Sequence, residues 1–279
     1  MDEQRLGSGR MSALDASREE FENAGDDPSA EGKYVYCVIR DDSAREFGDI
    51  GIGGESRVYT VNHGGLAAVV SDTPLVIYDP TRENVLAHEF VNETVMREFT
   101  VIPMSFGTVF RSEEDVAQLL RSTHEAFSDV LEKMKDKIEF GVQIRWDRDR
   151  VVESIEKEHD EIRKLKDEIT RNAASSTYFA RMQLGRLIEA ALEDSAGRFV
   201  ATVHEQLKPV CVASRSNKVI GDRMIMNAAF LVERAAEKAF DEAVKELSRR
   251  YENMLTFKYT GPWPPYNFVN IKLKLEKAD

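Results

Sequence analysis

Residues 259–269 read Tyr-Thr-Gly-Pro-Trp-Pro-Pro-Tyr-Asn-Phe-Val and hold three of the eight prolines in the chain. Each proline fixes its own φ and lacks an N–H donor, so we do not expect an ordinary strand or helix here. Gly261 supplies the one freely bending joint of the stretch. The residues therefore predict a rigid loop that packs its aromatic rings across the end of a sheet.

The side chains of this loop allow two interpretations. In the first, the rings are simply part of the core. In the second, part of the loop is a docking surface, because aromatic side chains are common anchors of binding energy and a stiff loop loses little entropy on binding. The candidate partner-binding residues are Trp263, Pro265, Tyr266 and Phe268.

Two further blocks accompany this stretch. Residues 101–110 read Val-Ile-Pro-Met-Ser-Phe-Gly-Thr-Val-Phe, and residues 226–232 read Met-Asn-Ala-Ala-Phe-Leu-Val. Together with residues 261–269, they resemble the gas vesicle GvpF/GvpL family, and the similarity runs in order over most of the chain. None of the three blocks is a catalytic signature. Ser105 departs from the family pattern, in which a basic residue often precedes Phe-Gly-Thr.

The composition is that of an acidic globular protein. The 279 residues carry a net charge of −12, with 42 % hydrophobic and 32 % charged residues. This balance argues against a nucleic acid or a lipid membrane as the main partner. No apolar run reaches the length of a membrane span. Residues 1–32 hold nine acids and three arginines, half of the net charge, and are expected to form a disordered acidic tail.

An N-terminal α+β domain is expected over residues 33–137. Residues 34–39 are β-branched and aromatic, which predicts a central strand. Residues 58–61 and 66–71 predict two more strands joined by a hairpin turn. Two helices follow, because Thr81 and Ser112 are suitable N-cap residues before apolar positions at helical spacing.

A C-terminal domain is expected over residues 138–279. Residues 138–146 alternate apolar and polar side chains, which predicts a strand with one buried face. Apolar residues at helical spacing predict a helical hairpin over about 149–207, with a break at 173–176 and with His159 on the apolar stripe. Strands at 210–213, 225–232 and 255–259 and a helix at 233–251 complete the order βαββαβ. This order predicts a ferredoxin-like domain with an inserted helical hairpin.

The residues match no catalytic, cofactor or metal motif. His88-Glu89 begins like the zinc motif HExxH, but position 92 is Asn. The glycine-rich run at 51–54 lacks the Lys and the following helix of a phosphate loop, so we expect a flexible connection between strands. Cys37 and Cys211 are interpreted as two buried free thiols. We therefore expect no cofactor, no metal ion and no catalytic residue.

The family resemblance implies two α+β domains and a non-enzymatic role in assembling the gas vesicle shell. It implies that the hydrophobic shell subunit and other gas vesicle accessory proteins are the partners, in the cytoplasm and at the gas vesicle. From the residues alone, two other classes stay open. One is an enzyme on a ferredoxin-like scaffold with an unrecognised site. The other is a self-associating scaffold, a homo-oligomer that uses the helical hairpin.

Overall fold

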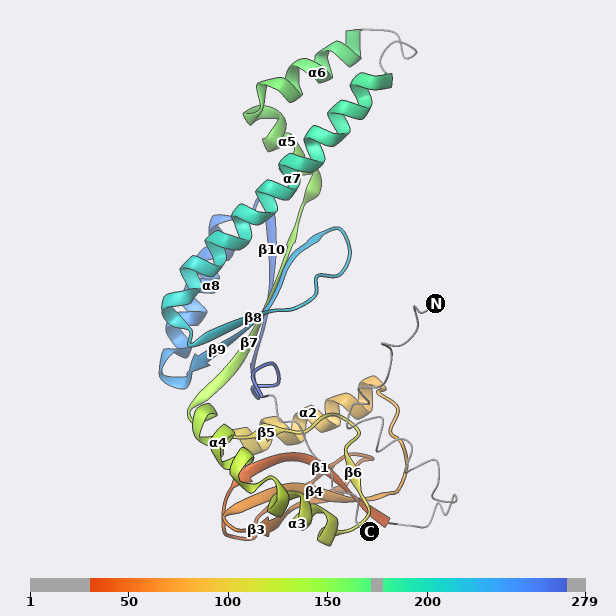
Figure 1. The fold of residues 1–279 in the computed structure, drawn as a ribbon, viewed down its shortest axis with the longest axis vertical. Coiled ribbons are helices and arrows are strands. Elements are labelled where there is room, and N and C mark those ends of the chain that lie inside the picture. Colours follow the sequence, from red (N-terminus) through yellow and green to blue (C-terminus); the bar gives the residue numbers. More distant parts are fainter. Residues whose placement is uncertain (1–30, 172–177, 270–279) are drawn as a thin grey trace, which may run out of the picture. The chain divides into compact units, whose positions relative to one another are not determined.

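The computed structural model describes residues 31–171 and 178–269. The chain forms two compact α+β units, each with its own antiparallel sheet. Unit 1 comprises Met1–Lys135 and Pro264–Asp279, and unit 2 comprises Asp136–Trp263. Figure 1 shows the elements of both units. The predicted mixture of helix and sheet in an α+β chain is confirmed.

The sheet of unit 1 has six strands in the order β2-β3-β4-β1-β5, with β6 also paired to β1. Its central strand β1 is buried along most of its length, as the apolar run at 34–39 predicts. Glu31 and Gly32 already belong to β1, so the expected tail ends two residues early, and the rest of it lies outside the described residues. The strands are β1 (Glu31–Arg40), β2 (Glu46–Gly51), β3 (Ser56–His63), β4 (Leu66–Pro74), β5 (Ile102–Pro103) and β6 (Val109–Phe110).

Helices cover both faces of this sheet. Tyr34 of β1 contacts α2 (Arg82–Met96), whereas Val35 and Val38 pack in a cluster with α3 (Glu113–Ser122) and α4 (His124–Met134). Both predicted caps are confirmed. Thr81 Oγ1 accepts from the N–H of Asn84 at 3.3 Å, and Ser112 Oγ accepts from the N–H of Asp115 at 3.2 Å.

Two features of unit 1 differ from the sequence prediction. Strand β2 was not predicted, because its residues show no apolar alternation, but β3 pairs with its backbone along one edge of the sheet. The single helix expected after Ser112 is divided at Thr123, whose φ of −113° and ψ of 13° leave the helical region.

The sheet of unit 2 has four strands in the order β10-β7-β9-β8, all antiparallel. The predicted alternation in β7 is confirmed on the buried face, where Ile138, Phe140, Val142 and Ile144 are at most 2 % exposed. Glu139 on the other face is also buried. The strands are β7 (Lys137–Trp146), β8 (Ala213–Ser216), β9 (Met224–Glu233) and β10 (Leu255–Trp263).

The helices of unit 2 complete the predicted βαββαβ order. Figure 1 shows α6 beside α7, as expected for a helical hairpin, and the predicted break at 173–176 lies outside the described residues. His159 was expected inside a helix but is the exposed residue between α5 and α6, with φ of −110° and ψ of 103°. The classification as ferredoxin-like stays a prediction. The helices are α5 (Arg148–Glu158), α6 (Asp160–Arg171), α7 (Tyr178–Leu207) and α8 (Glu237–Arg250), with the short 3-10 helices η1 (Lys208–Val210) and η2 (Arg234–Ala236).

The proline-rich stretch differs from the expected loop, because β10 continues through Pro262 to Trp263. An edge strand tolerates proline, since one of its sides needs no N–H donor. The peptide bond before Pro262 is cis, and Gly261 has a φ of 120°. A Cβ at Gly261 would lie 2.8 Å from the carbonyl oxygen of Glu139, so glycine allows the close approach to β7.

The compact units differ from the expected domain limits at the C-terminal end. The expected C-terminal domain, 138–279, extends beyond unit 2, because residues 264–269 belong to unit 1. Val269 packs against the core cluster of unit 1, which is the physical reason for this return of the chain.

We predict that Ile144→Ala lowers the free energy of unfolding by about 2–5 kcal/mol, because it leaves a cavity in a fully buried site. Arg145→Ala on the exposed side of the same strand is the control and should change it by less than about 0.5 kcal/mol. Denaturant titration measures both. Equal effects of the two substitutions would contradict the assignment of the buried face.

Candidate functional site

The structure does not bring the four predicted partner-binding residues into one compact unit. Trp263 ends β10 in unit 2, whereas Pro265, Tyr266 and Phe268 belong to unit 1. Pro265 is buried, Trp263 and Phe268 are half-buried, and Tyr266 is 36 % exposed. Backbone bonds from Tyr266 N–H to Pro264 O at 2.7 Å and from Phe268 N–H to Pro265 O at 3.0 Å close a tight turn. Of the four residues, Tyr266 offers the most accessible ring.

Tyr266 lies against α2 and β1 of unit 1. Burial raises the pKa of its hydroxyl, and the negative charges of Glu89 and Glu93 on α2 raise it further. The hydroxyl end of the ring is therefore held within unit 1, in a low-dielectric environment.

Two large apolar side chains of α2 are exposed to solvent. Leu86 is 51 % exposed and Phe90 is 48 % exposed. Leu86 and Phe90 lie one helical turn apart. Glu89 and Glu93, whose charges act on Tyr266, form the neighbouring row on the surface of the helix. We call Leu86, Phe90 and Tyr266 the α2 face.

The α2 face was missed in the sequence analysis because another stripe explains the helix. The core-facing side carries His88, Val91 and Val95, which are all buried. Leu86 and Phe90 lie off that stripe at a spacing of one turn. That pair of exposed large apolar residues is the signal that could have identified the face.

A buried polar cluster lies beneath α2. The hydroxyl of Tyr34 on β1 is 3.0 Å from Nδ1 of His88 and accepts a hydrogen bond from the N–H of Gly107 at 2.9 Å. The side-chain amide of Asn92 donates to the carbonyl oxygen of His88 and lies 3.1 Å from its Nε2. Three segments that are distant in the sequence meet at this cluster.

The partners of His88 select a neutral ring. The Tyr34 hydroxyl faces Nδ1 at 3.0 Å and the Asn92 amide nitrogen, a donor, faces Nε2 at 3.1 Å, so both ring nitrogens have polar partners inside the protein. Protonation would place a second N–H against the donors of Asn92. Burial lowers the pKa of His88 to about 4 and outweighs a hydrogen bond with the Met104 backbone, which acts in the opposite direction. In this geometry His88 is a structural group that links α2 to Tyr34 of β1.

We predict that this cluster makes the folded state sensitive to acid. His88 titrates near pH 6.5 when unfolded and near pH 4 when folded, so the unfolded state gains a proton first as the pH falls. Stability is fully present above about pH 6.5 and falls by on the order of 3 kcal/mol as the pH drops to about 4.

Urea titrations at several pH values measure this loss. The comparison is with His88→Gln, which cannot titrate and should lose less stability over the same pH window, whatever its stability at neutral pH. Parallel pH profiles for the two proteins would contradict the assignment.

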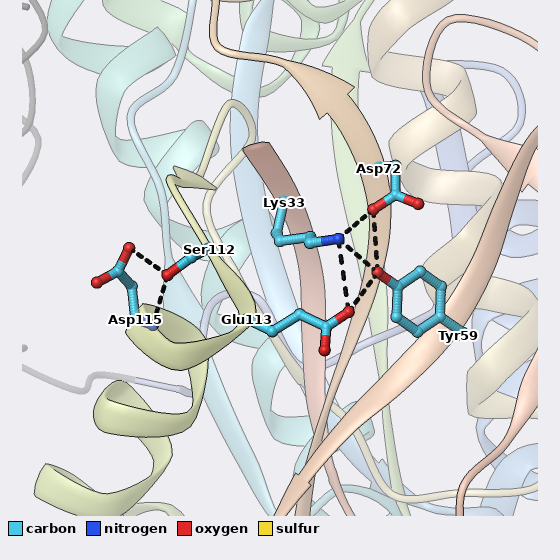
Figure 2. A network of polar contacts seen from close by, with 6 residues as sticks. All are labelled: Lys33, Tyr59, Asp72, Ser112, Glu113 and Asp115. Atoms are coloured by element: carbon cyan, nitrogen blue, oxygen red, sulfur yellow. Dashed lines mark hydrogen bonds and ion pairs between the residues drawn. The ribbon is translucent and has the colours of Figure 1, made fainter. Parts of the chain in front are cut away.

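A second polar network lies at the surface of unit 1, between the sheet and α3 (Figure 2). The ammonium group of Lys33 on β1 donates to the hydroxyl of Tyr59 on β3 at 2.8 Å and to the carboxylate of Asp72 on β4. It also lies 3.5 Å from Glu113, the first residue of α3. Tyr59 lies within hydrogen-bond distance of both acids and, with one proton, donates to one of them at a time.

The electrostatics of this network describe an ion pair. Burial lowers the pKa of Lys33, but its hydrogen bonds to Asp72 and Tyr59 outweigh this and hold the pKa above its usual value. Burial raises the pKa of Asp72, but the bonds from Lys33 and Tyr59 bring it below the usual value. A lysine that stays charged is not a nucleophile, and an acid with a lowered pKa is a poor base. The network therefore fixes α3 to the sheet.

We predict that Tyr59→Phe lowers the free energy of unfolding by about 1 kcal/mol, because Lys33 loses an acceptor and the acids lose a donor. Arg57→Ala on the same strand removes an exposed ion pair with Glu46 and should leave the stability nearly unchanged. Chemical denaturation measures both. An equal loss for the two variants would contradict a specific role for the hydroxyl.

The remaining motifs have structural positions. The run at 51–54, which was expected to be a flexible connection, begins at the end of β2. Its Ile52 is buried and donates its N–H to the Tyr36 hydroxyl at 2.7 Å, so this hydrogen bond fixes the connection at Ile52. Cys37 is a buried free thiol, as expected, whereas the free thiol of Cys211 is only half-buried. Within residues 31–171 and 178–269, no group of three potential ligands is arranged for a metal ion. None of the helices in these ranges is long and apolar enough to cross a membrane.

Comparisons with known proteins extend over most of the chain. A family described as "Gas vesicle synthesis protein GvpL/GvpF" matches residues 32–270. Gas vesicle protein F1 of Halobacterium salinarum is 31 % identical over 250 residues, which cover 88 % of this chain and 97 % of that protein. Gas vesicle protein L of Streptomyces sp. is 27 % identical over 259 residues, which cover 86 % and 93 %.

A solved structure shares the fold. The crystal structure of the gas vesicle protein GvpF from Anabaena sp. PCC7120 superimposes with a TM-score of 0.75 at 24 % identity. The match covers 86 % of this chain and 99 % of that chain.

The fold and the comparisons define the class as a gas vesicle protein built from two α+β units. The chain belongs to the GvpL/GvpF family of gas vesicle synthesis proteins. The resemblance drawn from the three sequence blocks is confirmed. The family is described by gas vesicle synthesis and not by a chemical reaction.

Proposed function

We propose that this protein is a non-enzymatic accessory factor of gas vesicle assembly that binds the hydrophobic shell subunit. It acts in the cytoplasm and at the gas vesicle, together with other gas vesicle proteins. Family membership supports the general role. The polar clusters of unit 1 support a non-enzymatic role, because Lys33 and His88 are hydrogen-bonded to structural partners and their pKa shifts do not suit acid–base catalysis.

The observation that carries the proposal is the α2 face. Three large apolar side chains lie partly exposed along one helix and the turn beside it. Exposed apolar clusters of this kind mark interaction sites more often than isolated apolar residues do. A hydrophobic shell subunit aggregates unless its apolar surface is covered before assembly, and a face of this kind is suited to cover it.

The α2 face is also held in place. The hydrogen bond between His88 and the Tyr34 hydroxyl joins the helix to β1, and the tight turn after Pro264 fixes Tyr266. A preorganised face loses little conformational entropy when a partner binds. The predicted role of Tyr266 is retained in this proposal, with Leu86 and Phe90 added to it. Pro265 and Phe268 belong to the turn that carries Tyr266, and Trp263 ends β10 directly before it.

We predict that Leu86→Ser and Phe90→Ser weaken capture of the shell subunit by at least about tenfold, equal to 1.4 kcal/mol. Both side chains are about half exposed, so the melting temperature should change little. The measurement is capture of co-expressed shell subunit on the tagged protein, with melting followed by circular dichroism. Tyr266→Ala should act in the same direction.

The matched control is Phe179→Ser, because Phe179 is 82 % exposed on α7 in unit 2. Its capture should equal that of the unmodified protein. If Phe179→Ser abolished capture while the α2 variants retained it, the docking surface would lie on the helical hairpin. If capture fell only in proportion to stability, the α2 face would be structure alone.

A further inference from the structure

The two edges of the sheet in unit 2 differ in a way that bears on binding. At one edge, β10 is interrupted by Pro262 and by an irregular register between Thr260 and Trp263. Proline and bulges are common means of preventing further strand pairing. At the other edge, β8 pairs only with β9 among the described residues and contains no proline. In the part of the chain that the structure describes, the sheet is therefore protected at the β10 edge and open at the β8 edge.

The register identifies the open backbone groups of β8. The N–H of Asn217 donates to the carbonyl oxygen of Asn227 at 2.7 Å, which continues the pairing of β8 with β9. Because an antiparallel strand alternates the direction of its backbone groups, Ser214 and Ser216 direct their N–H and C=O away from β9. Both serines are exposed. These four groups form a template for one more strand.

The loop between β8 and β9 is hydrogen-bonded to β7 and exposes two apolar side chains to solvent. The backbone N–H of Trp146 donates to Arg223 O at 2.9 Å, and its indole N–H donates to Asp222 O at 3.1 Å. On this anchored loop Val219 is 45 % exposed and Ile220 is 72 % exposed. Figure 1 shows the loop extending beyond β8 and β9. An anchored pair of exposed branched side chains beside an open edge is suited to contact an added strand.

The charge of this region is opposite to that of the whole chain. Residues 213–223 contain three basic residues and one acidic residue, whereas the net charge of the chain is −12. Arg215, Lys218 and Arg223 are all exposed. Two copies of a basic edge repel each other, so a second copy of this chain is disfavoured as the occupant. An acidic strand is complementary to the edge.

We propose that the β8 edge is a second interaction surface, which binds an extended acidic peptide segment of a partner protein by strand addition. The backbone of Ser214 and Ser216 forms the ladder with the added strand. Lys218 and Arg223 attract its carboxylates, and Val219 and Ile220 cover its aliphatic side chains. The surface belongs to unit 2 alone and does not depend on shell-subunit binding at the α2 face.

The experiment uses the full chain and a fluorescent eight-residue peptide that alternates valine and glutamate, with binding followed by anisotropy. We expect saturable binding that Ser214→Pro weakens at least about tenfold, because proline removes an N–H directed at the added strand. Ser214→Ala keeps that N–H and is the matched control, with unchanged affinity expected. Lys218→Glu together with Arg223→Glu should also weaken binding.

Three results would overturn the proposal. The first is no saturable binding up to about 1 mM peptide, the limit of weak specific association. The second is equal binding of a peptide with lysine in place of glutamate. The third is a concentration-dependent dimer in sedimentation that Ser214→Pro abolishes, since the edge would then serve a second copy. Circular dichroism and urea titration test whether the Ser214→Pro variant is folded. If that variant is unfolded, the test of the proposal is the peptide affinity of the Lys218→Glu, Arg223→Glu double variant.

Discussion

Unit 1 depends on the buried hydroxyl of Tyr34, which joins three segments that are distant in the sequence. It accepts the N–H of Gly107 and lies 3.0 Å from His88, so β1, the segment before β6 and α2 share one polar centre. A buried hydroxyl without partners would be costly, and here each partner is itself a buried or backbone group. The opposite face of β1 packs Val35 and Val38 against α3 and α4. The position of α2 therefore follows from the polar contact and not from apolar packing alone.

This arrangement connects the core of unit 1 to its surface. The side of α2 that carries His88 and Asn92 is fixed, so the opposite side presents Leu86 and Phe90 on a rigid helix. Tyr266 returns from the end of β10 to the same helix, where burial and the acids of α2 keep its hydroxyl protonated. Because the polar cluster of Tyr34 and His88 holds the buried side of α2, the exposed α2 face is held in place as well. The ion-pair network around Lys33 has the corresponding role for α3 (Figure 2).

Local signals in the sequence predicted much of the fold. Thr81 and Ser112 are caps because a short side chain can accept an N–H of the first helical turn, and this requires no knowledge of the rest of the chain. The alternation in β7 was equally readable. Strand β2 was not, because an exposed polar edge strand is paired through its backbone and leaves no apolar pattern. The extension of β10 through Pro262 was missed for the related reason that only its position at an edge makes proline acceptable.

The candidate sites were less predictable because they depend on distant contacts. The failed zinc motif at His88 turned out to mark a structural cluster, and its partner Tyr34 lies 54 residues away in the sequence. The measurement that tests the central role of this cluster most directly is amide hydrogen exchange in Tyr34→Phe, which removes the hydroxyl and keeps the ring. Our account predicts that Gly107 and the amides of α2 around His88 lose protection together, while β7 of unit 2 stays unchanged. Loss of protection at Gly107 alone, with α2 as protected as before, would contradict it.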